Sequence, residues 1–204
     1  RIIDQGKNFG TISVLGNKNT FVDINGLYIS GGGESFVNGI HYTSQFTIIN
    51  SRVLINNSDF SRSTADDGLN IINSFVEIKN STFHNNYADQ VDLDFCNGII
   101  SNNRFLYPVD KNNGDGLDVS GAHLVVNNNK FSGFGDKAIS VGENSNVLLM
   151  LNNINKSNIG IAVKDGSTAI IYRNKYNSVA EKVSLYRKKN IYKEPFAEID
   201  NNIG

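Results

Sequence analysis

The sequence predicts an all-β fold, a right-handed parallel β-helix solenoid with about 22 residues per coil, and three observations support it. The 204 residues include 32 Asn and 19 Gly but only 2 Pro, which is typical of many short strands joined by tight corners. No stretch shows the roughly 3.6-residue periodicity of a long helix. Short apolar runs instead recur along the chain at a nearly constant spacing.

Two columns of residues define the repeat. The first closes motifs such as INNSDF (55–60) and IKNSTF (78–83), and it consists of Phe60, Phe83, Phe105, Phe131, Ile154 and Tyr176. The second consists of Leu69, Val91, Leu117, Ile139, Ile161 and Val183. Both columns are displaced by the same four-residue insertion within 106–113, which indicates a real repeat. Its period is too short for a propeller blade or a pair of helices.

Each coil is expected to contribute three strands in order. Strand one carries the inward pairs Leu69–Ile71, Val91–Leu93, Leu117–Val119, Ile139–Val141, Ile161–Val163 and Val183–Leu185. Strand two carries Val53–Ile55, Val76–Ile78, Leu124–Val126, Val147–Leu149 and Ala169–Ile171. Strand three carries the aromatic column, stacked inside the solenoid.

One corner of the solenoid is expected to be lined by asparagine. The residues are Asn57, Asn80, Asn102 and Asn128, one per coil. Their amides would form hydrogen bonds from coil to coil and satisfy the turn backbone. Leu151 is expected at the same corner, with its side chain more exposed than the strand leucines.

The chain is expected to form one domain over residues 1–204. Residues 1–45 would hold irregular first coils with an inserted loop (31–42), residues 46–187 the regular coils, and residues 188–204 a cap over the open end. Because the chain opens at Arg1 with no Met and no signal peptide, we expect a processed chain or a domain excised from a larger protein.

Charge and hydropathy exclude two classes of function. The 19 Lys and Arg residues balance 20 Asp and Glu residues, which argues against a nucleic-acid partner. No apolar run reaches the roughly 18 residues needed to span a bilayer, so no membrane insertion is expected.

Acidic residues gather on the outward positions of strand one. These positions are Asn70, Asp92, Asp118, Ser140, Ala162 and Ser184, with Asp94 two residues after Asp92. Asp67, Asp89, Asp115 and Lys137 come just before strand one. Stacked coils would place equivalent carboxylates about 5 Å apart, where they share protons or hold a cation. Asp67, Asp89 and Asp115 are also ordinary turn residues, and that interpretation stays open.

With its coil repeat and asparagine corner, the chain resembles the pectate-lyase-like right-handed β-helices over about residues 40–190. NGDGLD (113–118) is also similar to the Asn-x-Asp-Gly-x-Asp motif of polygalacturonase-type glycosidases, and GDKAISV (135–141) to their later Gly-Asp-Asp motif. This resemblance implies catalytic positions at Asp115, Asp136 and residue 137, which is Lys137 in this chain. The later His-Gly and Arg-x-Lys motifs of that group have no counterpart here.

We therefore predict a carbohydrate-active protein that acts on an extended, acidic polysaccharide along the strand-one face. The predicted catalytic residues are Asp92, Asp115, Asp118 and Lys137; the predicted substrate-binding residues are Asp67, Asn70, Asp89, Asp94 and Asp136; and a calcium site is predicted at Asp92, Asp94 and Asp118. Lys137 would remove a sugar C5 proton, which favours a lyase or epimerase over a hydrolase.

Two alternatives remain open from the sequence. Lys137 would simply pair with Asp115 or Asp136, or the whole module would be a non-catalytic structural or glycan-binding β-helix of a surface or coat protein. An extracellular or cell-surface location is expected in either case, with other domains of a longer chain as neighbours.

Overall fold

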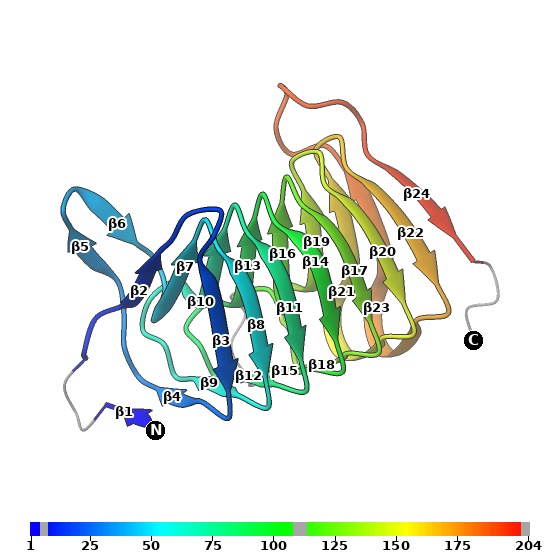
Figure 1. The fold of residues 1–204 in the computed structure, drawn as a ribbon. Coiled ribbons are helices and arrows are strands. Elements are labelled where there is room, and N and C mark those ends of the chain that lie inside the picture. Colours follow the sequence, from blue (N-terminus) through cyan, green and yellow to red (C-terminus); the bar gives the residue numbers. More distant parts are fainter. Residues whose placement is uncertain (5–7, 108–113, 201–204) are drawn as a thin grey trace.

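The computed structural model describes residues 1–4, 8–107 and 114–200. Every regular element in these ranges is a strand. None of the described residues belongs to a helix long and apolar enough to cross a membrane. The strands wind into a stack of coils, each paired in parallel with the coils on either side (Figure 1).

Three rows of strands run along the stack. The strand-one row comprises β2 (Ile12–Leu15), β7 (Phe46–Ile49), β10 (Asp67–Ile72), β13 (Asp89–Asp94), β16 (Leu117–Ser120), β19 (Lys137–Gly142) and the second halves of β21 (Asn153–Lys164) and β23 (Lys175–Tyr186). The strand-two row comprises β3 (Phe21–Asn25), β8 (Arg52–Asn56), β11 (Phe75–Lys79), β14 (Asn97–Ser101), β17 (His123–Asn127), β20 (Asn146–Met150), β22 (Thr168–Tyr172) and β24 (Phe196–Ile199). The strand-three row comprises β1 (Ile2–Ile3), β4 (Tyr28–Ser30), β9 (Asp59–Ser61), β12 (Thr82–His84), β15 (Arg104–Leu106), β18 (Lys130–Ser132) and the first halves of β21 and β23.

The register between coils confirms both predicted columns. Leu69 pairs with Val91, and the same alignment continues through every later coil to Val183. Phe60 pairs with Phe83, and that column runs to Tyr176. The four phenylalanine rings stack at centroid distances of 5.2, 5.3 and 4.5 Å. Period-two alternation turns the predicted aliphatic pairs of strands one and two into the same core, where those between residues 53 and 171 are buried. The last predicted pair needs correction, because Val183 is only partly buried and Leu185 is 45% exposed on β23, which has no further coil beside it among the described residues.

The asparagine corner differs from the prediction by one residue. Asn57, Asn80, Asn102 and Asn128 are exposed and adopt a left-handed backbone, with φ of 49, 52, 58 and 55°. The buried ladder lies one position later, at Ser58, Ser81, Asn103, Asn129, Asn152 and Asn174. The turning position needs positive φ, which Asn tolerates better than most other residues that carry a side chain, and the side chain that follows then points inward.

The true ladder is continuous where the predicted one was broken. The backbone N–H of Asn103 donates to Asn129 Oδ1 at 2.9 Å, and that of Asn129 donates to Asn152 Oδ1 at 3.0 Å. Asn152 in turn donates to Asn174. Leu151 occupies the corner as predicted, with a left-handed φ of 58°. It is 44% exposed, far more than the buried leucines of the regular strands, but no more than Leu185 at 45%.

The two ends of the chain add detail to the predicted layout. β2, β3 and β4 already form a coil, paired with β7, β8 and β9. The inserted loop carries an antiparallel hairpin of β5 (Ser35–Val37) and β6 (Ile40–Tyr42). The segment predicted as a cap carries strand β24, which pairs with β22 and extends the strand-two row. Most of the predicted insertion, residues 108–113, and residues 201–204 lie outside the described residues.

The aromatic stack gives a test of the core. Phe83→Ala should lower the free energy of unfolding by about 3–5 kcal/mol, because it removes a fully buried ring that contacts rings in the coils before and after it. Urea unfolding at neutral pH measures this. Phe75→Ala, at a ring that is 50% exposed, is the matched control and should cost much less. Equal losses for the two variants would contradict the assigned core.

The shift of the corner by one residue gives a second test. Asn129→Ala should destabilise the fold by about 1–3 kcal/mol for each buried group left unpaired, and it frees the Asn103 N–H and the Ile100 carbonyl. Asn128→Gly should be nearly neutral, because glycine adopts positive φ freely and the Asn128 side chain is exposed. Thermal unfolding of both variants decides which asparagine belongs to the ladder.

Candidate functional site

The predicted acidic residues come together on the outer surface of the strand-one row. Asn70, Asp92, Asp118 and Ser140 occupy one register column, each paired with the next. The alternation that places Leu69 and Ile71 in the core points this column away from the core, although Asn70 and Ser140 are themselves buried. We call Asp67, Asp89, Asp92, Asp94, Asp115 and Asp118 the acidic face.

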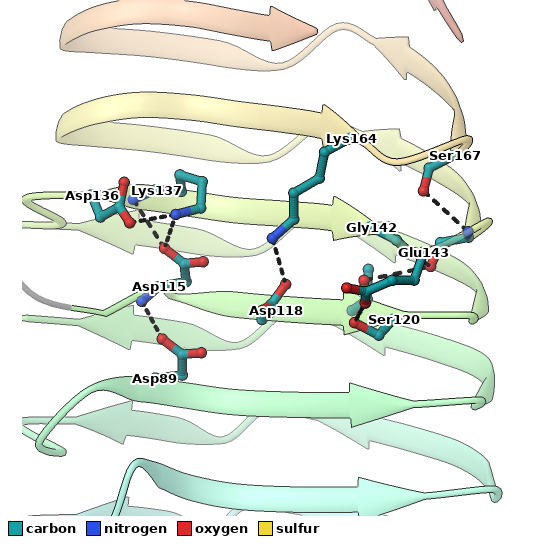
Figure 2. Close-up of polar contacts among 12 residues, drawn as sticks. Asp89, Asp115, Asp118, Ser120, Asp136, Lys137, Gly142, Glu143, Lys164 and Ser167 are labelled. Atoms are coloured by element: carbon teal, nitrogen blue, oxygen red, sulfur yellow. Dashed lines mark hydrogen bonds and ion pairs between the residues drawn. The ribbon is translucent and has the colours of Figure 1, made fainter. Parts of the chain in front are cut away.

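A second column runs beside the first at the start of each strand. Asp67 pairs with Asp89 in register. The backbone N–H of Asp115 donates to Asp89 Oδ1 at 2.6 Å, and the backbone N–H of Lys137 donates to Asp115 Oδ1 at 3.2 Å (Figure 2). Asp89 and Asp115 thus each accept a backbone hydrogen bond from the following coil, whereas Asp67 accepts one from the Thr43 hydroxyl at 3.0 Å. Asp89 and Asp115 therefore support the backbone where the next strand begins, and the carboxylates of this column are also close to one another.

Lys137 is held in an ion pair at the end of this column. Its Nζ lies 3.1 Å from Asp115 Oδ1 and also contacts the carboxylate of Asp136 (Figure 2). Burial lowers the pKa of Lys137, but the negative charges of Asp115 and Asp136 outweigh burial and raise it above its ordinary value. An ammonium held this way keeps its proton at neutral pH. The geometry therefore favours the ion-pair role of Lys137 over the role of base.

A second lysine, which the sequence analysis did not identify, crosses the face from the other side. Lys164 ends β21, and its side chain lies over Gly142 and reaches Asp118, with Nζ 3.8 Å from Asp118 Oδ1 (Figure 2). A Cβ on Gly142 would approach Lys164 Cε to 2.9 Å, so the glycine leaves room for the lysine stem. The available signal was a glycine at an outward strand position, followed one coil later by lysine.

The far rim of the face is tied to the C-terminal segment. Glu143 bonds to the Ser120 hydroxyl and to the ammonium of Lys189. Burial raises the pKa of Glu143, but these contacts outweigh it and lower the pKa below its ordinary value. The carboxylate of Asp165 accepts the backbone N–H groups of Lys188 and Lys189, both at 2.7 Å. Sequence spacing gave no sign of these contacts, because they join the regular coils to a segment outside the repeat.

The start-of-strand carboxyl groups hold protons unusually well. Burial, followed by the charge of Asp89, raises the pKa of Asp67 to about 8. Burial and the charge of Asp89 also raise the pKa of Asp115 to about 8, although Lys137 opposes the shift. Burial raises the pKa of Asp89 to only about 6, because the backbone N–H of Asp115 stabilises its ionised form. Asp89 therefore ionises before Asp67 and Asp115 as the pH rises.

The pKa values of the mid-strand carboxyl groups, Asp92 and Asp94, are also raised. Burial, then the charges of Asp67 and Asp94, raise the pKa of Asp92 well above its ordinary value. Burial also raises the pKa of Asp94, opposed by a hydrogen bond from Asn70. The Asn70 amide donates to Asp92 Oδ2 at 3.0 Å and to Asp94 Oδ2 at 3.4 Å, so it joins the two side chains.

The geometry assembles a candidate cation site different from the predicted one. Carboxylate oxygens of Asp89, Asp115 and Asp118 lie within 4.8 Å of one another, and no other described group of three possible ligand residues does so. The predicted set was Asp92, Asp94 and Asp118. Carboxylate oxygens suit calcium, and the buried Asp118 Oδ1 has no hydrogen-bond partner among the described residues. The residues present thus fit a hard cation at Asp89, Asp115 and Asp118.

All nine predicted site residues lie on this one face. Asp136 sits at its edge, half-exposed and paired with Lys137. Chemically, the face offers a proton donor beside a proton acceptor, two fixed ammonium groups and oxygen ligands for a cation.

Comparison with known proteins agrees with the fold. A family model described as "Right handed beta helix region" matches residues 67–203. Full-length tailspike protein 2 from an Escherichia coli O157:H7 bacteriophage superposes with a TM-score of 0.56 at 15% identity, covering 97% of this chain and 31% of that one. The enzymatically active domain of tailspike protein 2 from bacteriophage CBA120 gives a TM-score of 0.55 at 14% identity, covering 97% and 34%.

A third solved structure, an alginate lyase from Paenibacillus sp. str. FPU-7, has a TM-score of 0.49 at 12% identity and covers 97% of this chain and 79% of that one. A search of curated protein sequences gives no match. The chain spans about a third of the length of the tailspike chains. Because the family model covers more than half of the chain and the coils stack in parallel, the chain belongs to the right-handed β-helix family.

Proposed function

We propose that this β-helix acts on an extended acidic polysaccharide laid across the acidic face, as part of a larger protein at the cell surface or outside the cell. The observation that carries the proposal is the register column Asp67, Asp89 and Asp115, in which three carboxyl groups are stacked side by side and Asp67 and Asp115 are buried. Burial and this crowding raise the pKa of Asp67 and Asp115 to about 8 and that of Asp89 to about 6. Aspartate within a strand is unfavourable, and the same outward column accepts Asn70 and Ser140 elsewhere. A purely structural face would not need the carboxylates.

The pair Asp89 and Asp115 suits elimination at a uronic acid. Asp89, with a pKa of about 6, is largely ionised at neutral pH and would remove the sugar C5 proton. The C4–O4 bond would then break, and Asp115 would give its proton to the leaving O4 oxygen, which produces an unsaturated uronate. Asp115 would be neutral before this step, with Lys137 paired to the Asp136 carboxylate, and would pair with Lys137 as an ion once its proton is lost. An epimerase would instead return a proton to C5 from the opposite side. Asp89 thus replaces Lys137 as the proposed base.

The remaining residues would hold the polymer. Asp67, whose pKa is raised to about 8, would donate a hydrogen bond while protonated and would not repel a sugar carboxylate. Burial and neighbouring charges shift the pKa of Asp92 in the same direction. Asp94 and Asp136 would offer further polar contacts along the face, while the buried Asn70 amide holds Asp92 and Asp94 in place. Calcium bound at Asp89, Asp115 and Asp118 would neutralise a uronate, but it would occupy the oxygens assigned here to proton transfer. Assays with and without calcium therefore distinguish the two uses of the cluster.

The activity test replaces the proposed base. Asp89→Asn should reduce release of unsaturated uronates from polygalacturonate or alginate by about 10²–10⁴-fold, since the amide cannot accept the proton. Absorbance of the new double bond measures elimination, reducing ends detect hydrolysis, and proton NMR of the polymer detects epimerisation. Asp59→Asn, on the strand-three row, is the control and should leave activity unchanged. If the wild-type chain neither converts nor binds any acidic polymer, the module is structural.

The protonation states have their own test. Asp67 and Asp115 have folded pKa values of about 8, above their unfolded values, so the folded state binds more protons between about pH 4 and 8. Their contribution to stability is present below about pH 4 and is lost as pH rises through 8. Asp67→Asn should flatten this decline and stabilise the chain at pH 8. Urea midpoints from pH 4 to 9 measure it; an unchanged slope would contradict the shifted pKa values.

A further inference from the structure

A second surface has the opposite charge and lies at the corner between strands one and two, in the first coils. A hollow of about 780 Å³ is lined there by Gly16, Asn17, Lys18, Asn50, Ser51, Arg52, Asn73 and Phe75. A smaller hollow of about 290 Å³ is lined by Phe21, Arg52, Val53, Leu54, Phe75 and Glu77. The two hollows share Arg52 and Phe75, so they form one surface, which we call the corner groove.

The register places an arginine between two exposed rings. Phe21 pairs with Arg52, and Arg52 pairs with Phe75, on the adjacent strands β3, β8 and β11. The rings are 57% and 50% exposed, unlike the buried phenylalanines of the aromatic column. The guanidinium of Arg52 lies over the Phe75 ring, 5.7 Å from its centroid. This contact holds the charge in place without neutralising it.

The positive charge of the corner groove has no internal carboxylate partner. Among the described residues, neither Arg52 nor Lys18 forms an ion pair. The acid that lines the groove, Glu77, pairs with Lys79 at 2.6 Å. An exposed cationic hollow walled by apolar rings is therefore open to an anionic ligand with an apolar face.

Amide groups complete the lining. The Asn73 amide donates to Asn50 Oδ1 at 2.7 Å, which fixes both side chains at the rim of the larger hollow. Within the described part of the chain, the side-chain N–H groups of Asn50 and the side-chain oxygen (Oδ1) of Asn73 have no hydrogen-bond partner. A pair of fixed amides matches the donors and acceptors of neighbouring sugar hydroxyls.

We infer that the corner groove binds a carboxylate-bearing sugar unit of an acidic polysaccharide. Arg52 and Lys18 would pair with the carboxylate, the rings of Phe21 and Phe75 would pack against the C–H face of the pyranose, and the asparagine amides would bond its hydroxyls. The hollow has the size expected of a site for such a ligand. Asn73 directly follows β10, which carries Asn70, so the groove adjoins the acidic face.

This inference does not require the acidic face to be catalytic. A polymer bound in the corner groove would be retained by a chain in which the proposed base is removed. Asp89→Asn should therefore keep its groove affinity even if it loses all turnover, and the two proposals can fail separately.

The experiment measures binding of oligogalacturonate to the whole chain by isothermal titration calorimetry, on the Asp89→Asn background to prevent turnover. Arg52→Met keeps the apolar stem, removes the charge and should weaken binding at least about tenfold, because charge-assisted pairs to carboxylate are the strong ones. Phe75→Ala should also weaken binding. Neutral dextran should bind to none of the variants.

The matched control lies in another hollow of the same fold. Arg104 and Lys130 line a hollow of about 260 Å³ with Asn102, Asn103 and Asn128, which supplies similar charges and amides but no aromatic ring. Arg104→Met should leave affinity unchanged. An equal loss in Arg52→Met and Arg104→Met would mean diffuse charge attraction and would overturn the inference. It would also fall if Arg52→Met bound normally, or if it only altered self-association in sedimentation.

Discussion

Each coil of this chain is hydrogen-bonded to its neighbours in a fixed parallel register, and that register constrains everything else. A residue at one position in a coil lies one strand spacing, about 4.8 Å, from its equivalents above and below. Each side chain therefore lies beside the side chains at the equivalent position of the neighbouring coils, which are often of the same type. Phenylalanine stacks on phenylalanine at 4.5–5.3 Å, and Asn129 lies between Asn103 and Asn152. For apolar rings and amides this repetition is favourable, because both types of side chain satisfy one another.

The same register is unfavourable for carboxylates, because it holds the negative charges of the acidic face close together. Asp92 beside Asp118, and Asp67 beside Asp89, cannot move apart without breaking the ladder that holds the coils. The chain offsets part of the repulsion with Lys137 and Lys164 at the edge of the cluster, and the remainder appears as raised pKa values. Asn70 and Ser140 fill the same column without this repulsion, which is the reason for proposing a chemical role for the carboxylates.

Much of the fold could be predicted because the register repeats in the sequence. The apolar columns mark strand pairing directly, and the outward positions follow from period two. The corner was misassigned by one residue because each coil carries an adjacent pair, such as Asn102 and Asn103, in which the first residue turns the chain and the second bonds the next coil. Both residues of the pair are often asparagine in the sequence. Only the backbone conformation tells them apart, because the turning residue has positive φ.

The site was less predictable for a different reason. The positions of Asp89, Asp115 and Asp118 follow from the register, but the identity of the nearest oxygens depends on side-chain rotamers, so the predicted cation ligands were a neighbouring set. Lys164 reaches across Gly142, and Lys189 comes from outside the repeat. Neither contact leaves a periodic signal. Strand β24 was missed similarly, because a segment without repeat resumes the strand-two row.

The two charged surfaces would handle an acidic polymer by different physics. The corner groove offers Arg52, whose charge is fixed at every ordinary pH, against exposed rings. The acidic face offers carboxyl groups that accept a polymer carboxylate only while they hold protons or a cation. Most of the binding affinity for the polymer would then come from the corner groove. The acidic face would contribute less to binding and would instead stabilise the charge that develops during the reaction. That division is useful for catalysis, since binding energy gained away from the reacting bond can position the substrate.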